Sequence, residues 1–415
     1  MGESEKKVNK KLQIGMLTLL LTAALAPAQE VTGNWGAGYG SGSSSRIYRE
    51  GGGWVQEVSG SLSAARNVKL KTDMGNVRVQ GGAQNITYSF KMRVNGGSEE
   101  SARRRLESFR VTASRQGEWT VISGDCVGEC PRNASAEFVL EVPADTAQVE
   151  LGSGGGNLTA TGLNGTLAAE TGGGNLRLDA LGGPVSASSG GGSVEVGSVR
   201  SNLSVSTGGG NIHIGTAGGP LSVSTGGGTV TVDNGNNAVE VETGGGGIHI
   251  NRVGGALKAN TGGGNIEIGD VGGAVIAETG GGSIRVNSAR GQVRASTGGG
   301  NLELWGVGGG VRSETGAGSI TVELVSGPFH DSSIETGSGD IVVYLPEGMR
   351  VTVRAAVESC TGQGIVSDFA ELKIHSEGGQ WNPHEVYAEG SLNGGGPLLK
   401  IRTSNGSIQI HRGKK

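Results

Sequence analysis

The amino-acid sequence predicts an all-β protein whose middle half is a parallel β-solenoid (β-helix) with 18-residue coils of two strands each. A hydroxyl residue precedes a glycine-rich turn at a constant 18-residue interval, and every interval contains two short alternating apolar runs. Glycine makes up 83 of 415 residues, far above its usual share of about 7%. The fixed positions of valine, isoleucine and leucine argue against disorder.

Residues 1–28 are predicted to be a signal peptide. Four lysines precede an uncharged run over residues 12–26, and residues 26–28 (Ala-Pro-Ala) form a small-x-small cleavage pattern. An uncleaved anchor is the alternative, although a run of about 15 residues is short for a membrane span. We therefore expect an exported protein, periplasmic, in the outer envelope or secreted, that meets the membrane only transiently through this peptide.

The segments on either side of the repeats lack the strict period. Residues 29–53 are rich in glycine and serine and are predicted to form a flexible leader. Residues 54–150 and 346–415 contain alternating apolar runs without the long series of glycine triplets, which predicts β-rich caps. We expect these caps to keep the terminal strands of the solenoid from pairing with other chains.

One short α-helix is predicted in the first cap, at about residues 98–110. Ser98 is a suitable N-cap residue, and two glutamates follow it in the first turn, where the helix dipole favours negative charge. Leu106 and Phe109 belong to its apolar side. The arginines at 103–105 are expected to form a solvated face, with an anionic-ligand site as the alternative.

The repeats occupy residues 151–345. In the unit at 261–278, the first run supplies two large inward residues, Ile266 and Ile268, and the second run supplies a large residue followed by a small one. The hydroxyl residues before the triplets count as inward, at a corner, where they are expected to bond to a neighbouring coil. These residues are Ser153, Thr171, Ser189, Thr207, Thr225, Thr243, Thr261, Thr279, Thr297 and Thr315.

The glycine triplets are expected to supply positive φ values and close backbone approach at tight corners. On this interpretation Gly263→Val should disrupt folding locally. The next member of this series after Thr315 is Thr336, which comes later than the period requires, so three residues have been inserted around 326–329. This insertion predicts a loop that protrudes from the array.

Residues between the inward positions should point outward and form a polar row along one sheet. Neighbouring members are expected about 4.8 Å apart, and the alternating signs of Glu267, Arg285 and Glu303 suit cross-strand neighbours. We interpret the row as a solvated face. Its members are Arg177, Glu195, His213, Thr231, His249, Glu267, Arg285, Glu303 and Thr321.

Three cysteines exclude a disulfide-dense scaffold. In an oxidising compartment Cys126 and Cys130 can close a small loop, which leaves Cys360 outside that bridge. Zinc binding by the C-x3-C pattern is the alternative, but no second pair of ligands accompanies it.

Several stretches resemble a family of exported bacterial β-strand-repeat proteins known as the "putative adhesin" family, whose function is unknown. The resemblance covers roughly residues 55 to 412 and implies a parallel β-solenoid at or outside the cell envelope, in adhesion or envelope-stress signalling, with no catalytic residues to carry over. The long run of triplet-glycine units departs from the family pattern and implies an elongated stalk. The stretches are residues 68–79 (VKLKTDMGNVRV), the helix from Ser98, Val142-Pro143, Leu345-Pro346 and residues 403–408 (TSNGSI).

A calcium-binding β-roll is the strongest rival, because its nine-residue repeats also make 18-residue coils with two strands. Calcium needs carboxylate oxygens at each turn. The residue after each triplet is instead polar and uncharged or glycine, and it becomes acidic only at Asp340. No cofactor is therefore expected.

A carbohydrate-active β-helix enzyme is the second rival, since paired carboxylates can perform acid/base chemistry. The aspartates of the repeats before the insertion, Asp179, Asp233 and Asp270, are spread over different coils, and no nucleophile motif accompanies the histidines of the loops. His213 and His249 lie two coils apart, too far to share a metal. The inward threonines also argue against an ice-binding face. We expect no enzymatic activity.

The sequence thus predicts a non-enzymatic exported solenoid that acts as an adhesin-like, structural or interaction protein of the cell envelope. The signal peptide contains four lysines and two glutamates and so carries a charge of +2. Removing it changes the formal net charge from −4 to −4 − 2 = −6. This negative charge argues against nucleic acid as the partner. The expected partner is a protein or glycan at the envelope. Irregular exposed loops favour ligand contacts, and the candidate contact residues are Phe329, His330, Asp331, Trp381 and His384.

Overall fold

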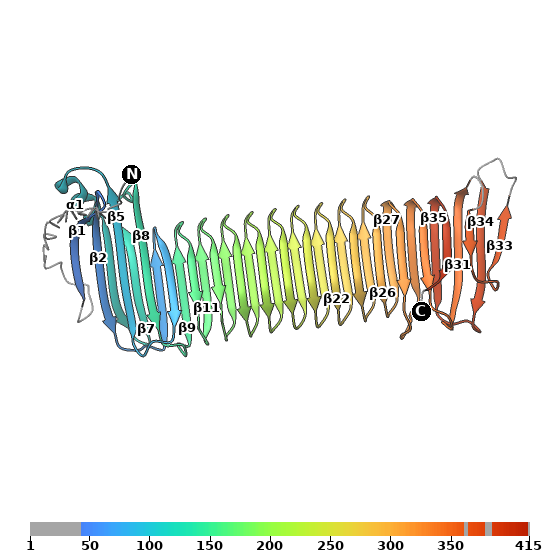
Figure 1. Ribbon diagram of the computed structural model, residues 1–415, viewed down its shortest axis with the longest axis horizontal. Helices are drawn as coiled ribbons and strands as arrows, with labels where there is room; N and C mark the ends of the chain where they lie inside the picture. The colour runs from blue at the N-terminus through green and yellow to red at the C-terminus, as the bar shows by residue number, and fades with distance from the viewer. Residues whose placement is uncertain (1–42, 361–363, 378–383, 414–415) are drawn as a thin grey trace, which may run out of the picture.

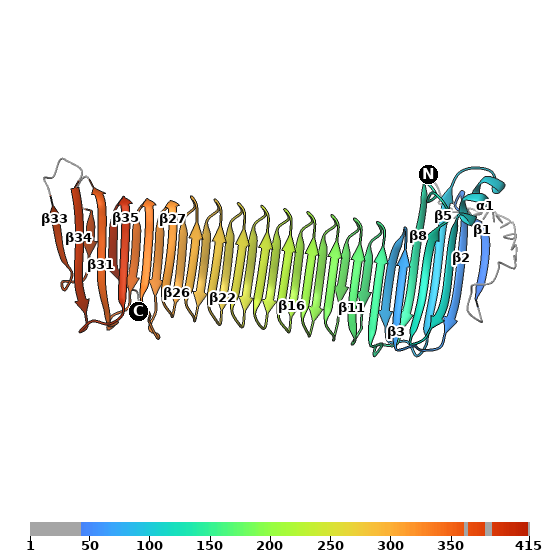
Figure 2. The same ribbon diagram turned by 180° about the vertical axis from the view of Figure 1, so that it is seen from behind.

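The computed structural model describes residues 43–360, 364–377 and 384–413. These residues form a long rod, in which strands stack side by side along the long axis (Figure 1). Within the described residues two sheets, here called sheet A and sheet B, run the length of the rod and enclose one continuous apolar core. Figure 2 shows the same stack from behind. The predicted all-β solenoid is confirmed.

Sheet A has 18 strands. From the end that carries the first cap, their order is β1 (Ser44–Glu50), β2 (Gly53–Leu62), β5 (Ile86–Asn95), β8 (Ala134–Val142), β4 (Asn76–Gly81), β10 (Leu158–Thr161), β12 (Leu176–Asp179), β14 (Val194–Val199), β16 (Ile212–Ala217), β18 (Val230–Gly235), β20 (Ile248–Val253), β22 (Ile266–Val271), β24 (Ile284–Ala289), β26 (Leu302–Val307), β28 (Ile320–Leu324), β30 (Ile341–Leu345), β36 (Ile408–Arg412) and β32 (Ile365–Ser367).

Sheet B faces sheet A across the core. Its order, from the same end, is β6 (Phe109–Gln116), β7 (Trp119–Cys126), β3 (Asn67–Thr72), β9 (Gln148–Ser153), β11 (Thr166–Thr171), β13 (Val185–Ser189), β15 (Leu203–Thr207), β17 (Leu221–Thr225), β19 (Val239–Thr243), β21 (Leu257–Thr261), β23 (Val275–Thr279), β25 (Val293–Thr297), β27 (Val311–Ala317), β29 (Ser332–Ser338), β35 (Leu398–Asn405), β31 (Val351–Cys360), β34 (His384–Leu392) and β33 (Lys373–Glu377).

The register confirms the predicted coil length. Ile266 pairs with Ile284 in sheet A, and Val275 pairs with Val293 in sheet B, each in parallel. The predicted inward residues are buried, and a further buried residue ends each even-numbered strand from β14 to β26, as Val271 does in β22. Because each coil encloses only a few apolar side chains, the core stays narrow, and adjacent coils must supply one another's backbone hydrogen bonds.

The glycine triplets work differently from the prediction. None of those between residues 154 and 300 has a φ value in the left-handed region. A Cβ added at Gly262 or Gly264 would instead overlap the carbonyl oxygen of Gly244 or Gly246 in the preceding coil, whereas a Cβ at Gly263 would meet no atom within 4 Å. Close approach of stacked turns therefore requires the first and third glycines, whereas neither positive φ nor a close contact at Gly263 supports the expected effect of Gly263→Val.

The corner hydroxyls are buried and bond between coils, as predicted. The Thr279 hydroxyl donates to the carbonyl of Gly264 at 2.8 Å and accepts from the backbone N–H of Gly282 at 3.3 Å. Ser189 makes the same pair of contacts with Gly174 and Gly192. Each side chain thus closes its own turn and joins it to the previous one.

At the far end of the rod, the stacking order departs from the chain order. The coil made by β35 and β36 lies between the coil of β29 and β30 and the strands β31 and β32. Ile401 accordingly pairs with Ile334 on one side and Ala355 on the other, and Ile408 pairs with Ile341 and Ile365. The strands near residue 400 thus resume the coil pattern of the repeats, and Figure 1 shows β35 beside β31.

The first cap contains the predicted helix, α1 (Glu99–Glu107). Ser98 is its N-cap, and its hydroxyl accepts from the N–H of Ser101 at 3.4 Å. The helix is shorter than predicted, because Phe109 already belongs to β6 and stacks on Phe90, with ring centroids 5.1 Å apart. In the described parts of the chain no helix is long and apolar enough to cross a membrane.

The predicted flexible leader does not extend to residue 53. Residues 44–50 form β1, which pairs antiparallel with β2 across a turn in which Gly51 and Gly52 have positive φ. Ile47 is buried, which explains why this stretch is a strand. The predicted signal peptide and the first part of the leader lie outside the described residues.

Candidate interaction surfaces

The predicted polar row runs along the outer face of sheet A in register. Neighbouring coils pair its charges: Arg177 with Glu195 at 3.2 Å, and Arg285 with Glu303 at 3.0 Å. These pairs are exposed, so each contributes only about 0–1 kcal/mol. The two histidines of the row bond to separate carboxylates: His213 lies 3.0 Å from Asp233, and His249 lies 3.1 Å from Glu267.

The residues that follow the triplets form a second ladder, at the turn where the β-roll alternative needs calcium ligands. The side-chain oxygen of Asn175 accepts from the backbone N–H of Ser193 at 2.8 Å, and that of Asn265 accepts from Ser283 at 2.9 Å. Asp340 likewise accepts from the N–H of Ser407 at 2.8 Å. These oxygens connect consecutive layers of the rod.

The inserted loop, residues 325–331, joins β28 to β29. Phe329 is half-buried and packs against the core, whereas His330 is exposed. Asp331 is exposed as well, but its Oδ1 accepts from the backbone N–H of Leu398 at 2.8 Å. The loop thus holds the start of β35 in place, and two of its three candidate contact residues have structural roles.

The second predicted contact region is not an exposed loop at His384. This residue begins β34, lies opposite Cys360 in the register and is only 8% exposed, so the prediction of a surface contact was wrong. Its burial follows from the inward alternation that it shares with Val386. Trp381 lies outside the described residues.

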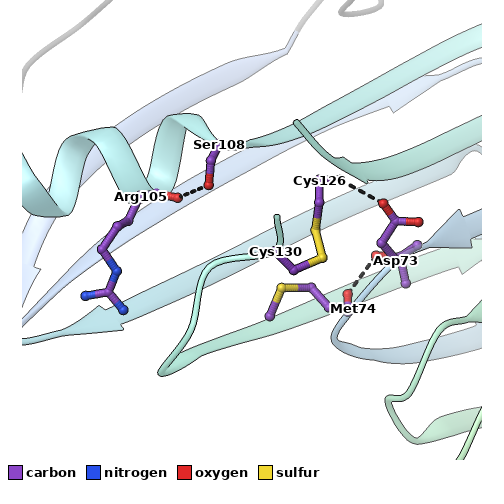
Figure 3. The surroundings of a disulfide bond; sticks show 7 residues. Asp73, Met74, Arg105, Ser108, Cys126 and Cys130 are labelled. Carbon is purple, nitrogen blue, oxygen red and sulfur yellow. Dashed lines mark hydrogen bonds between the residues drawn. A yellow bond between two sulfur atoms is a disulfide. The ribbon is translucent and has the colours of Figure 1, made fainter. Parts of the chain in front are cut away.

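Cys126 and Cys130 form a disulfide, which is one of the two roles that the sequence left open for them. Figure 3 shows Asp73 beside it, and the Asp73 carboxylate accepts from the backbone N–H of Cys126 at 2.8 Å. Among the described residues, Asp73 and these two cysteines are the one group of three with metal-ligating atoms close together. Since both sulfurs are in the disulfide, this group offers no thiolate ligand. Cys360 is buried in β31.

The coil of β35 and β36 is here called the inserted coil, because it lies between layers formed by earlier parts of the chain. Charged groups help to hold it against these layers. The Ser333 hydroxyl and, next, the Lys400 ammonium bond to Glu335 at 2.7 and 3.0 Å and hold the pKa of that carboxyl below its usual value. On the other face, the backbone N–H of Arg412 and then the His411 ring lower the pKa of Asp368. Both carboxylates therefore favour the docked coil while they are ionised.

Aromatic rings from three layers meet on sheet A, which sequence reasoning missed. Trp305 of β26 and Tyr344 of β30 have ring centroids 6.2 Å apart, and Tyr344 lies 5.8 Å from the ring of His411 in β36. Little in the sequence indicated this cluster, because the three inserted residues shift the 18-residue period between Trp305 and Tyr344. The rings add to the contacts of the inserted coil.

Sequence reasoning also missed a groove on the outside of sheet B. It has a volume of about 620 Å³ and lies between two ridges, where the chain enters each sheet B strand. The first ridge is Thr166, Pro184, Asn202, Pro220, Ala238, Ala256 and Ala274; the second is Ser186, Ser204, Ser222, Glu240, Lys258 and Ile276. The 18-residue spacing was visible in the sequence, but a ridge of mixed residue types shows no motif.

Comparison with known families identifies the class of protein that this rod represents. The model of the family described as Toastrack DUF4097 matches residues 65–304, which is more than half of the chain. The chain belongs to this family. No curated protein matches it.

Three of the similar solved chains have low TM-scores. A "putative cell adhesion protein" from Clostridium sporogenes is 8% identical, with 86% of this chain and 100% of that chain covered and a TM-score of 0.17. A "putative adhesin" from Bacteroides fragilis is 10% identical (86% and 96% covered, TM-score 0.20). A "putative lipid binding protein" from Parabacteroides distasonis is 11% identical (87% and 97% covered, TM-score 0.20). Likeness at this level supports no statement about function.

Proposed function

We propose that this protein is a non-enzymatic, exported rod of the cell envelope that acts as an adhesin-like or structural interaction protein. The observation that carries the proposal is the uninterrupted stack of coils whose outer row on sheet A is polar, with ion pairs between some neighbouring coils. The 18 strands of sheet A are separated by 17 intervals of about 4.8 Å, so the rod is about 80 Å long. Such a rod can hold a binding surface away from the point where it is anchored.

The disulfide supports export, because disulfides persist in oxidising compartments and are rare in the cytosol. The repeated rows support a mechanism of many weak contacts, in which each coil offers outward polar side chains to a protein or glycan. His330 is the exposed member of the inserted loop and remains a candidate contact.

Cell fractionation tests the location. Thiols of the natural producing cells are blocked before lysis, and the state of Cys126 and Cys130 is read in each fraction. We expect the protein in the envelope or the medium, with both thiols oxidised. Recovery in the cytosol with reduced thiols would contradict export.

Attachment assays test the interaction. Beads coated with residues 29–415 are expected to adhere to cells or to matrix glycans in a way that the soluble rod inhibits. Beads coated with a rod shortened by several whole coils are the matched control, because they carry fewer repeated contacts and should adhere less. Adhesion that does not depend on the protein coat would contradict the proposal.

Thermal melts of residues 29–415 in excess EDTA and then in millimolar calcium test the rival β-roll. One melting temperature in both conditions is expected for a metal-independent solenoid. A large rise with calcium would favour the rival.

A further inference from the structure

A groove of about 660 Å³ lies on the outer face of sheet A, beside the polar row. One wall is the ladder of residues that follow the glycine triplets, from Asn157 to Thr229, and the other is formed by Thr159 and the next four outward residues, through Thr231. The groove crosses four coil intervals, or about 19 Å. The next ladder position is Gly247, which has no side chain, so this wall ends there.

Three residues of the ladder wall, Asn157, Asn175 and Asn211, are exposed and keep one half of their amide group free. The side-chain oxygen of each accepts from the backbone N–H one coil later, at 2.8 to 2.9 Å. This contact determines which end of the amide is the oxygen, so the NH₂ group is the other end. Within the described residues none of the three amide nitrogens has a hydrogen-bond partner. The groove therefore carries fixed donors at multiples of one coil interval.

The charges at the groove are already paired. Arg177 pairs with Glu195 at 3.2 Å, and His213 lies 3.0 Å from Asp233. Among the lining residues, an anionic ligand would find no cation without a partner, and a charge is costly to remove from water unless it is paired. An uncharged ligand that is rich in oxygen acceptors fits this lining.

We infer that the groove binds an extended, uncharged β-1,4-linked glycan, whose oxygen atoms accept from the free NH₂ groups. One pyranose unit of such a chain is about as long as one coil interval, so successive units can meet successive coils. A peptide strand fits less well, because its carbonyls on one side recur about every 6.6 Å. The inference rests on the proposed interaction function and gives it a ligand class. Each contact is weak, so several coils in register are required.

Calorimetric titration of residues 29–415 with tetramers of β-1,4-linked glucose and of β-1,4-linked N-acetylglucosamine tests the inference. We expect saturable binding of at least one of them, and weaker binding of the α-1,4-linked glucose tetramer, whose chain is curved. Asn175→Asp/Asn211→Asp should weaken the binding at least tenfold. A carboxylate keeps the oxygen that accepts the backbone N–H, as Asp340 does in the same ladder, but it has no N–H to donate.

Asn265→Asp/Asn301→Asp is the matched control. Both residues are exposed members of the ladder with the same backbone contact, at 2.9 Å, and the same spacing of two coils, but neither lines the groove. This variant should bind the tetramer as the natural chain does, which separates the loss of donors from the added negative charge. Circular dichroism and the melting temperature check that both variants are folded.

Three results would overturn the inference: binding of neither β-linked tetramer, equal binding of the α-linked tetramer, and equal binding by the folded groove variant and the natural chain. The proposed function fails separately. If coated beads adhere although no tetramer binds, the interaction function stands and the glycan groove is excluded. If the beads do not adhere, the interaction function itself is contradicted.

Discussion

The hydroxyl of Thr279 lies 2.8 Å from the carbonyl oxygen of Gly264, which is fifteen residues earlier and one coil back. Its equivalents repeat this contact, for example Thr207 with Gly192 and Thr243 with Gly228. A row of buried hydroxyls therefore connects each coil to the next along one corner of the rod. The row accounts for the constant hydroxyl residue in the sequence.

Replacing Thr279 by valine should remove both hydrogen bonds of this corner while keeping the side-chain volume. The carbonyl of Gly264 and the N–H of Gly282 would lose their partner, which costs about 1–3 kcal/mol for each group left buried and unsatisfied. Urea denaturation measures the loss. Thr279→Ser is the control and should stay near the natural stability, since Ser189 makes the same contacts.

The glycines of one triplet should differ in their tolerance of alanine. Gly264→Ala is expected to lower stability by about 1–3 kcal/mol or more, because its Cβ would overlap the carbonyl of Gly246. Gly263→Ala should change stability by no more than about 0.5 kcal/mol, since nothing lies within 4 Å of the added atom. Equal melting temperatures for both variants would contradict this account of the corner.

Loss of the disulfide should affect the first cap and leave the repeats intact. The bridge closes a loop of about five residues, for which chain entropy gives a stabilisation of about 2 kcal/mol. Hydrogen exchange of the Cys126→Ser/Cys130→Ser variant should rise in β6 and β7 and remain unchanged around β21. Faster exchange along the whole rod would show that the cap controls the array.

Acid should loosen the inserted coil before the repeats. The folded pKa values of Glu335 and Asp368 lie below their usual values, about 4.3 and 3.9. Each therefore contributes stability that is present above the unfolded pKa and is lost as the pH falls through the lower folded pKa. Protection factors of the β35 and β36 amides, corrected for the intrinsic exchange rate at each pH, should fall from pH 6 to pH 3, and Glu335→Gln should reduce this pH dependence.

A deletion of one whole coil should be tolerated. Removing residues 262–279 joins Thr261 to Gly280 and keeps every later strand in its own sheet. The shortened rod should keep its β-rich circular dichroism and a single cooperative melt. Removing only residues 262–270 is the control; it places sheet A strands in sheet B positions and should unfold the array.

The repeats could be predicted well because one period determines both the pairing and the inward positions. Ile266 and Ile284 are in register for the same reason that they lie one period apart in the sequence. The role of the triplets could not be predicted in the same way. A glycine needed for φ and a glycine needed because a carbonyl oxygen lies close look identical in a sequence, and only the neighbouring coil distinguishes Gly263 from Gly264.

The ends of the rod and the candidate contacts were harder to predict. Ile401 pairs with Ile334 although several strands separate them in the chain, and no period announces this pairing. Asp331 looked like an exposed loop residue, yet it holds Leu398. The sheet B groove was missed because it depends on what Pro184, Ala238 and their equivalents jointly leave uncovered.

The position of the coil formed by β35 and β36 has a consequence for the order of assembly. Its neighbours on both sides come earlier in the chain, so the layer between them has to stay open until residues 398–412 have been synthesised. During synthesis, β31 and β34 can form their antiparallel pair before residues 398–412 are available. This layer can close only after the chain has been made through residue 412. A truncated product would keep exposed strand edges that quality-control proteases can recognise.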